Sequence, residues 1–198
     1  MTDPPPTFPA APPELIDLGG PRLVRCRPER AAATVAAINT SLEHLRPWMA
    51  WASEPATEAA MATFLATAEE LWDQRHDFGY SIVDADDERV LGGCGIHGRL
   101  GRHGLEIGYW VHVDHTGQGL ATGASRALTD AAFAIDGIDV VRIQCEDVNA
   151  RSARVPEKLG YRFDGVTVPE FGPCEGRPTQ RWELERAAWV AQGPGAPP

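Results

Sequence analysis

The stretch EIGYWVHVDHTGQGLATGA, residues 106–124, decides the fold of this chain. An apolar and aromatic run ends at a polar corner, where Gly117 and Gly119 stand one residue apart. From Gln118 to about Ile135, apolar residues then recur at the spacing of one helix face. The pattern predicts a strand, a glycine corner and an amphipathic helix whose first turn carries very little side chain.

A helix that begins at bare backbone is suited to binding an anion. Its first N–H groups lack partners, and the aligned peptide dipoles place about half a positive charge there. Phosphate groups commonly occupy such positions. Gly117 and Gly119 would let the backbone curl around a phosphate, and Ala121 would let a ligand pass close to the first turn. An ordinary glycine turn between strand and helix is the alternative interpretation.

Two nucleotide-binding motifs fail to account for the corner. A P-loop requires Lys followed by Ser or Thr after its last glycine, and GQGLATGAS (117–125) contains no Lys. A dinucleotide fingerprint would need Gly or Ala where Thr122 stands. Its acidic residue, expected about 20 residues on, would have to be Glu146 or Asp147, about 27 residues on. A nucleotide-dependent oxidoreductase is therefore a weak alternative.

Outside this stretch the chain alternates strands and helices. Residues 104–113 predict a third strand beside a hairpin that starts at Phe78 and turns at an acidic segment. The other predicted elements are a strand at 22–27, helices starting at Glu29 and Thr57, a strand at 139–147, a short helix at 149–160 and strands at 161–168 and 179–185. This order predicts an α/β domain with a mixed, mostly antiparallel central sheet of about six to seven strands flanked by about four helices.

The two ends of the chain differ from the middle in composition. Residues 1–13, MTDPPPTFPAAPP, predict a disordered Pro-rich leader, and residues 191–198 predict a flexible Gly/Pro tail. A single domain is therefore expected over residues 14–190. The leader has neither the basic start nor the apolar core of a signal peptide, and no stretch approaches the about 20 apolar residues of a membrane span.

Charge and cysteine content narrow the class of partner and the compartment. A formal net charge of −10 and a pI near 5.0 argue against non-specific binding to nucleic acid or to an anionic membrane, because phosphates are gripped by clustered Lys and Arg. The cysteines form no CxxC pair and predict reduced thiols in a cytoplasmic protein. They are Cys26, Cys94, Cys145 and Cys174.

Two histidines at the corner invite a metal interpretation. His112 and His115 flank Asp114, but a strand that turns a corner does not aim such side chains together as a helix would, and no third ligand is evident. No metal is therefore predicted. Cys145, on a strand with an inward apolar stripe and no accompanying His, is expected to be a buried and inert thiol.

A specific combination of motifs is formed by EIGYWV (106–111), TGQGLA (116–121) and NARSARVPEKLGYRFDG (149–165). Together they resemble the GNAT superfamily of acyl-CoA-dependent N-acetyltransferases, most closely its RimJ/RimL branch, which acetylates ribosomal proteins. The likeness extends from LVRCRP (23–28) to RWELE (181–185) and so covers most of the chain. It implies the GNAT fold and transfer of an acetyl group from acetyl-CoA to a primary amine.

The resemblance implies that acetyl-CoA is the co-substrate and that backbone N–H groups hold its diphosphate. The family signature at the helix start is Arg or Gln, two residues, Gly, one residue, then Gly or Ala, and Gly119 and Ala121 match its last two positions. Thr116 stands at the opening position, so one cation is missing. The residues expected at the diphosphate are Gly117, Gln118, Gly119, Ala121 and Thr122.

In the family, acetyl-CoA lies where the strand before the corner splays from the strand after the helix. Carried over, the first of these strands is residues 106–113, and a backbone N–H near Val111 or Val113 would polarise the thioester carbonyl. A fixed dipole aimed at growing negative charge acts as an oxyanion hole.

Transfer also requires an amine that has lost its extra proton, and an acidic side chain, or a water that it orients, is the usual base. Glu106 stands where the family often keeps such an acid, and Glu170 stands where the RimL-like branch carries a second one. A solvated strand carboxylate is the alternative interpretation of Glu106.

The family motif N-x-x-S at the start of the next helix falls on Asn149 and Ser152. The resemblance implies that Asn149 binds the pantetheine arm and that Ser152 lies near the sulfur, although both are also common helix caps. Many relatives carry a Tyr proton donor four residues beyond that Ser, where this chain has Pro156. Pro156 has no proton to donate and is expected to bend or tighten the helix.

The sequence thus predicts direct transfer of an acetyl group to a protein N-terminus or a small amine in a ternary complex. Alternatives are a non-catalytic acyl-CoA-binding or regulatory domain, and an acyltransferase that uses a longer acyl-CoA such as succinyl-CoA. Dimers are frequent in the family, so a homodimer is one possible assembly. Trp48 and Trp51 are candidates for the acceptor pocket and, equally, for the core.

Overall fold

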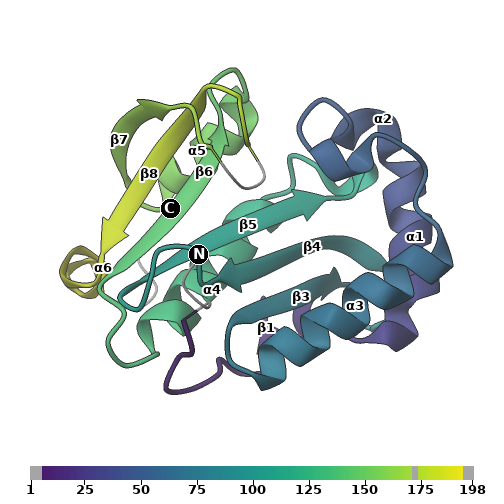
Figure 1. Cartoon of the computed structure of the whole chain (residues 1–198), viewed down its shortest axis with the longest axis horizontal. Coiled ribbons are helices and arrows are strands. Elements are labelled where there is room, and N and C mark those ends of the chain that lie inside the picture. Colours follow the sequence, from purple (N-terminus) through teal and green to yellow (C-terminus); the bar gives the residue numbers. More distant parts are fainter. Residues whose placement is uncertain (1–5, 171–173, 194–198) are drawn as a thin grey trace.

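Eight strands form one sheet in the computed structural model, which describes residues 6–170 and 174–193 (Figure 1). The strands are β1 (Leu15–Asp17), β2 (Arg22–Arg25), β3 (Asp77–Val83), β4 (Val90–His97), β5 (Gly104–Val111), β6 (Val140–Glu146), β7 (Arg162–Thr167) and β8 (Thr179–Glu185). Their order across the sheet is β1-β2-β3-β4-β5-β6-β8-β7. All neighbours are antiparallel except β5 and β6, which run parallel.

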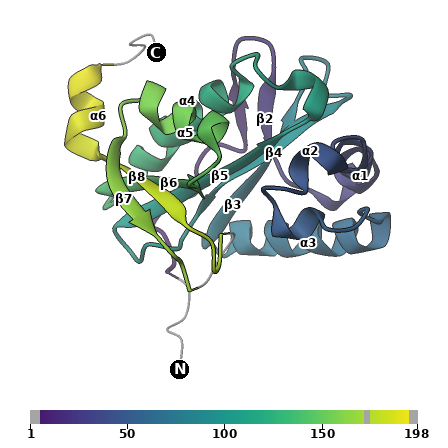
Figure 2. The same cartoon turned by 90° about the horizontal axis from the view of Figure 1, so that it is seen from above.

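Helices cover both faces of this sheet. The α-helices of the described residues are α1 (Ala31–Thr40), α2 (Leu42–Leu45), α3 (Glu58–Asp73), α4 (Leu120–Phe133), α5 (Ala150–Lys158) and α6 (Arg186–Gln192), and the 3-10 helices are η1 (Pro28–Arg30), η2 (Ala50–Ala52) and η3 (Val113–His115). Figure 2 shows α1, α2 and α3 on one side of the sheet and α4 and α5 on the other. None of these helices combines the length and the hydropathy that crossing a bilayer requires.

The apolar stripes that the sequence predicts are the ones that the structure buries. Along α4, Ala124 and Leu128 have no exposed surface. Along β6, the alternating side chains of Val141, Ile143 and Cys145 are at most 5% exposed. Periodicity of 3.6 in the helix and 2 in the strand therefore locates the core, and the predicted α/β fold with a mostly antiparallel sheet is confirmed.

The described residues hold more elements than predicted: eight strands rather than six to seven, and six α-helices rather than about four. β1 has only three residues and is defined by its pairing with β2, so it carries almost no local pattern. α6 begins directly after β8 without a capping side chain. The strand predicted over residues 104–113 ends at Val111, because Val113–His115 turns into η3.

Residues 6–13, inside the segment predicted as a disordered leader, lie against the sheet. Phe8 is 1% exposed, its ring centroid lies 6.2 Å from that of Phe78, and its N–H donates to the carbonyl of Arg75 at 3.0 Å. The side chains of Arg75 and Tyr80 also donate to the carbonyls of Pro9 and Pro13, each at 2.8 Å, so residues 6–13 are anchored although their composition resembles a linker. At the other end, α6 extends to Gln192, inside the segment predicted as a tail.

The parallel pair at the centre of the sheet is short. β5 and β6 are in register only from Gly104 opposite Val140 to Ile107 opposite Ile143. Beyond that point β5 stays paired with β4 as far as Val111, while β6 stays paired with β8 (Figure 1). The two strands therefore part at their carboxyl ends, directly before the glycine corner.

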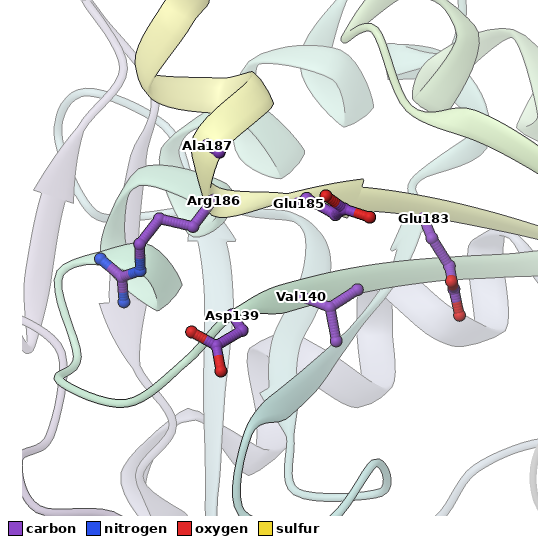
Figure 3. Close-up of a pocket in the computed structure, with 6 residues that line it drawn as sticks. All are labelled: Asp139, Val140, Glu183, Glu185, Arg186 and Ala187. Carbon is purple, nitrogen blue, oxygen red and sulfur yellow. The ribbon is translucent and has the colours of Figure 1, made fainter.

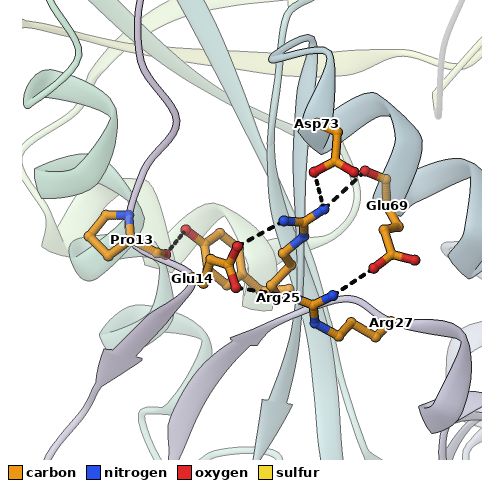
Figure 4. A network of polar contacts seen from close by, with 7 residues as sticks. Pro13, Glu14, Arg25, Arg27, Glu69 and Asp73 are labelled. Carbon is orange, nitrogen blue, oxygen red and sulfur yellow. Dashed lines mark hydrogen bonds and ion pairs between the residues drawn. The ribbon is translucent and has the colours of Figure 1, made fainter.

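A polar network joins the first strands to α3 (Figure 4). Arg25 on β2 is 8% exposed and donates to a carboxylate oxygen of Glu14 at 2.8 Å, to one of Asp73 at 2.5 Å and to the carbonyl of Glu69 at 3.2 Å. Arg27 also binds Glu14 and Glu69, but it is 45% exposed. Arg25 is therefore the buried centre of the network, and Arg27 is its solvated neighbour.

We expect Arg25→Leu to lower the free energy of unfolding by about 2 kcal/mol. Removing one partner of a buried ion pair costs about 3–5 kcal/mol, and the exposed partners Glu14 and Asp73 reduce this because water can solvate them. Arg27→Leu is the matched control, with an expected loss of less than about 1 kcal/mol. Urea denaturation measures both, and equal losses would contradict the assignment of Arg25 as the centre.

Candidate functional site

The glycine corner joins η3 to α4. Gly117 and Gly119 have φ values of 75° and 79°, in the left-handed region that residues with a Cβ rarely adopt. Gly119 is the N-cap of α4, and the first helical bond runs from the N–H of Gly123 to the carbonyl of Gly119 at 2.9 Å. The two glycines therefore permit the abrupt turn that starts the helix.

The corner is open on its outer side. A Cβ built at Gly117, Gly119 or Gly123 would meet no atom within 4 Å. Within the part of the chain that the structure describes, no hydrogen bond involves the N–H groups of residues 117–122. A row of backbone donors at a helix N-terminus thus faces outward, which is the arrangement that holds an anion.

Two side chains of the corner stabilise it through hydrogen bonds to backbone carbonyls. Gln118 donates through its amide nitrogen to the carbonyl of Asp114 at 3.0 Å, and the hydroxyl of Thr116 donates to the carbonyl of Val113 at 3.0 Å. Thr116 therefore closes the turn instead of supplying the cation that the family signature has at its position. The side chain of Gln118 is likewise used inside the corner, so its contribution to an anion would come from its backbone N–H.

Two backbone N–H groups are expected at the thioester, and only that of Val111 remains available for it. The N–H of Val113 donates to the hydroxyl of Ser41 at 3.0 Å, which corrects the expectation for Val113 because that donor is already used. The N–H of His112 binds the carbonyl of Leu91 at 2.8 Å. Since donors alternate along an antiparallel strand, the N–H of Val111 points away from β4, toward the side from which β6 has parted.

Glu106 on β5 is buried, with 5% of its surface exposed. One carboxylate oxygen accepts from the guanidinium of Arg99 at 2.6 Å, and the other accepts from the side-chain amide of Gln144 at 2.6 Å. The solvated-carboxylate interpretation is therefore wrong. Each oxygen keeps a further lone pair, so the group can still accept from an amine that reaches it.

Glu170 is exposed in the loop that follows β7. The last residue of β7, Thr167, pairs with Thr179, which also pairs with Glu146, so Glu170 follows β7 at the same carboxyl edge as the parting of β5 and β6. Among the described residues, no hydrogen bond or ion pair joins Glu170 to Glu106. Glu170 thus lies at this edge, whereas Glu106 lies within the part of β5 that is still paired with β6, and the structure does not bring the two predicted acids into contact.

The start of α5 holds the predicted N-x-x-S motif. The side-chain oxygen of Asn149 accepts from the N–H of Ser152 at 3.1 Å, so Asn149 is the N-cap of the helix. The hydroxyl of Ser152 lies 2.9 Å from that of Tyr109 on β5. Burial raises the pKa of Tyr109, although the hydrogen bond with Ser152 opposes the shift, so the phenol stays protonated at neutral pH.

Sequence reasoning missed Tyr109, although the strand pattern carries a signal for it. Alternation along β5 places Tyr109 on the same face as Leu105 and Ile107, which are buried in the main core. A polar aromatic side chain on a core-facing position needs a hydrogen-bond partner. That partner lies 43 residues away in the sequence, which no local pattern reveals.

Exposure separates Cys145 from Trp51. Cys145 is 5% exposed, and burial raises the pKa of its thiol to about 11, as for an inert thiol. Trp51 is 51% exposed and lies edge-on to Trp110 at 6.2 Å, so it is not a core residue. The described residues contain no group of three or more His, Cys, Asp or Glu side chains placed to hold a metal ion.

One open groove lies away from the corner. It has a volume of ≈ 500 Å³ and surrounds the start of β6 and the end of β8, at the opposite end of β6 from the parting of the strands (Figure 3). Three of its six lining residues are acidic, namely Asp139, Glu183 and Glu185, and the guanidinium of Arg186 donates to backbone carbonyls. The corner and the parted strands are therefore the candidate site.

Comparison with known proteins agrees with this geometry. Residues 22–162 match the family model of the acetyltransferase (GNAT) domain. The uncharacterized protein YkkB of Bacillus subtilis (strain 168) is 34% identical over 99 residues, which cover 46% of this chain and 58% of YkkB. The putative ribosomal N-acetyltransferase YdaF of the same organism is 26% identical over 145 residues, which cover 70% of this chain and 75% of YdaF.

Among solved structures, the ribosomal-protein acetyltransferase RimL in complex with coenzyme A has the same fold. Its TM-score is 0.79 at 16% sequence identity, and the alignment covers 88% of this chain and 99% of RimL. The fold expected from the motifs around the glycine corner is thereby confirmed.

Proposed function

Since the chain belongs to the acetyltransferase (GNAT) domain family of acyl-CoA-dependent N-acyltransferases, we propose that it acetylates a primary amine by direct attack in a ternary complex. One observation carries this proposal. Unpartnered N–H groups at residues 117–122 stand beside the point where β5 and β6 part. The first feature suits the diphosphate of acetyl-CoA, and the second suits its pantetheine arm.

The residues at the corner fit the diphosphate through their backbone. The donors are the N–H groups of Gly117, Gln118, Gly119, Ala121 and Thr122, and the open face at the glycines lets phosphate oxygens approach them. Because Thr116 supplies no charge, the backbone and the helix dipole provide the attraction. Asn149, at the start of α5, is placed at the same edge of the sheet and is proposed for the pantetheine arm.

In the transfer step, the amine nitrogen attacks the thioester carbon, the carbonyl oxygen becomes negative, and the carbon–sulfur bond then breaks. The N–H of Val111 is proposed to stabilise the oxygen, because it points into the parting and is fixed by the ladder with β4. The hydroxyl of Ser152 is proposed to donate a hydrogen bond to the departing sulfur. Glu106 and Glu170 are proposed to receive the proton that the amine loses, directly or through water.

For the acceptor we propose a protein N-terminus. YdaF is named as a putative ribosomal N-acetyltransferase, and RimL acetylates a ribosomal protein. A net charge of −10 attracts a basic partner such as a ribosomal protein. The exposed indole of Trp51 beside Trp110 offers an apolar surface for the residues that follow the acceptor amine.

The test of this function is release of CoA thiol from acetyl-CoA in the presence of N-terminal peptides, polyamines or aminoglycosides, with succinyl-CoA as a second donor. We expect at least one basic N-terminal peptide to raise thiol release well above the rate without acceptor. Binding of acetyl-CoA without any amine-dependent release would instead indicate a non-catalytic acyl-CoA-binding domain. A preference for succinyl-CoA would change the acyl group and leave the amine chemistry intact.

Glu106→Gln is expected to lower kcat/KM by about 100-fold, because general bases contribute about 10²–10⁴ to the rate. Arg99→Gln is the matched control, since it breaks the same 2.6 Å ion pair but keeps the carboxylate. Steady-state kinetics and melting temperatures measured on both variants separate a role of Glu106 as general base from a role as structural ion-pair partner. If both variants melt earlier and both keep wild-type kcat/KM, Glu106 is a structural ion-pair partner.

A further inference from the structure

α5 continues through a proline that leaves one of its carbonyl groups without a helical partner. Pro156 lies inside the helix and has no N–H, so the carbonyl four residues earlier, that of Ser152, lacks its usual donor. The hydroxyl of Tyr109 donates to this carbonyl at 3.2 Å. A side chain from β5 therefore replaces the backbone bond that the proline removes.

The same phenol also contacts the side chain of Ser152. Its oxygen lies 2.9 Å from the Ser152 hydroxyl oxygen. Tyr109 has one proton to donate, and a carbonyl can only accept. In one state the phenol donates its hydrogen bond to the Ser152 carbonyl, and the Ser152 hydroxyl donates to the phenol oxygen. In the other state the phenol donates to the Ser152 hydroxyl oxygen, and the Ser152 O–H can then donate a hydrogen bond to another acceptor.

The backbone around this pair is held on both sides. The N–H of Ser152 is bound to the side chain of Asn149, and Tyr109 belongs to the part of β5 that has left β6 but remains in the ladder with β4. Tyr109 lies two residues before Val111, whose N–H points into the parting. The hydroxyl pair therefore bridges β5 and α5 beside the proposed path of the pantetheine arm.

We propose that Tyr109 is a positioning residue that aims the hydroxyl of Ser152 at the leaving sulfur. The inference rests on the proposed function. As the carbon–sulfur bond breaks, its electron pair moves to sulfur, and Ser152 turns its O–H toward the resulting thiolate. Tyr109 then moves its own hydrogen bond from the Ser152 carbonyl to the Ser152 hydroxyl oxygen.

No proton leaves the phenol in this exchange. Tyr109 is partly buried and packs against the core, and ionising it there would place an uncompensated charge in an apolar environment. The arrangement therefore supplies a hydrogen bond to the thiolate, and the proton that finally neutralises the thiolate comes from solvent. This assigns Tyr109 a different task from that of a tyrosine which donates its own proton.

The first test compares Tyr109→Phe with Ser152→Ala and with the double variant. We expect Tyr109→Phe to lower kcat about 10-fold while the Kd for acetyl-CoA changes less than about threefold. In the Ser152→Ala background the same change is expected to leave kcat unaffected, because the hydroxyl that Tyr109 aims is gone. Independent, multiplicative losses would overturn the proposal.

Pro156→Ala separates the positioning role from a purely structural one. This substitution restores a backbone N–H that can bind the Ser152 carbonyl, so in this background Tyr109→Phe should cost less in melting temperature than in the wild type. The loss in kcat should persist, since the Ser152 hydroxyl still loses its partner. If the Pro156→Ala background abolishes both losses, Tyr109 only caps the orphaned carbonyl, and the proposal fails.

A readout without turnover keeps this inference distinct from the acetyltransferase assignment. The thiolate absorbance of bound CoA, taken as a difference from the complex with desulfo-CoA, gives the pKa of the CoA thiol. We expect that pKa to rise by about one unit in Tyr109→Phe, because the thiolate loses an aimed hydrogen bond. An unchanged value overturns the role of Tyr109, whereas a raised value in a protein that acetylates no amine contradicts only the proposed function.

Discussion

Gly119→Val is expected to raise the Kd for acetyl-CoA by about 100-fold. At a φ of 79°, a β-branched residue is strained, and its side chain would occupy the face on which nothing lies within 4 Å. A phosphate would then lose about two charge-assisted hydrogen bonds, each worth about 1.5–3 kcal/mol. A loss of about 3 kcal/mol corresponds to about 100-fold in Kd. Isothermal titration calorimetry with acetyl-CoA measures it.

Gly101→Val is the matched control for backbone strain. Gly101 has a φ of 75° and nothing within 4 Å of an added Cβ, but it lies in the loop between β4 and β5. We expect it to reduce the melting temperature about as much as Gly119→Val and to leave the Kd for acetyl-CoA within about twofold. Equal weakening of binding by both variants would show that strain, and not the corner, controls affinity.

Val111→Pro is expected to lower kcat by about 100- to 1,000-fold, the usual effect of removing one donor from an oxyanion hole. Proline has no N–H, and the N–H of Val111 is not part of the ladder with β4, so the sheet loses no hydrogen bond. Binding of acetyl-CoA should change less than about threefold, because the donor acts on charge that appears only during transfer.

Val111→Ala keeps the N–H and removes most of the side chain, so it serves as the control for packing. We expect its kcat to stay within about threefold of wild type. Should the alanine variant lose as much kcat as the proline variant, the side chain of Val111 and not its N–H would matter, and a different donor would have to stabilise the oxygen. Single-turnover measurements at saturating acetyl-CoA separate this step from binding.

The strand, the corner and α4 follow from local sequence. Gly117 and Gly119 permit positive φ values, and the apolar repeat from Gln118 to Ile135 marks one buried face of α4. The expectation that β5 and β6 part came instead from the resemblance to a family. The parting depends on where a parallel ladder ends, at Ile107 and Ile143, which no repeat in either strand reveals.

Long-range side-chain contacts explain what the sequence could not predict at the site. The hydroxyl of Ser41, 72 residues earlier in the sequence, accepts the hydrogen bond of the Val113 N–H. This contact removes one of the two donors expected at the thioester. Gln144 and Arg99 enclose the carboxylate of Glu106 from two other segments. Such pairs form because the topology brings the segments together, and a hydroxyl or amide in a linear sequence does not identify its partner.

The same limit applies to the N-terminal segment. The prolines of residues 1–13 give it the composition of a linker, yet Phe8 is buried to 1% exposure. Burying an aromatic side chain of this size contributes about 1.5–3 kcal/mol, which helps to offset the entropy of ordering the few residues around it. Composition averages over the segment and so does not reveal that Phe8 is buried.

The central claim is that the backbone N–H groups of residues 117–122 hold the diphosphate of coenzyme A. An NMR titration of the isotopically labelled protein with coenzyme A tests it most directly. We predict that the amide protons of these residues shift downfield together and become protected from exchange, while those around Gly101 do not move. Saturation with coenzyme A that leaves the amides of residues 117–122 unshifted and fully exchanging would contradict the account.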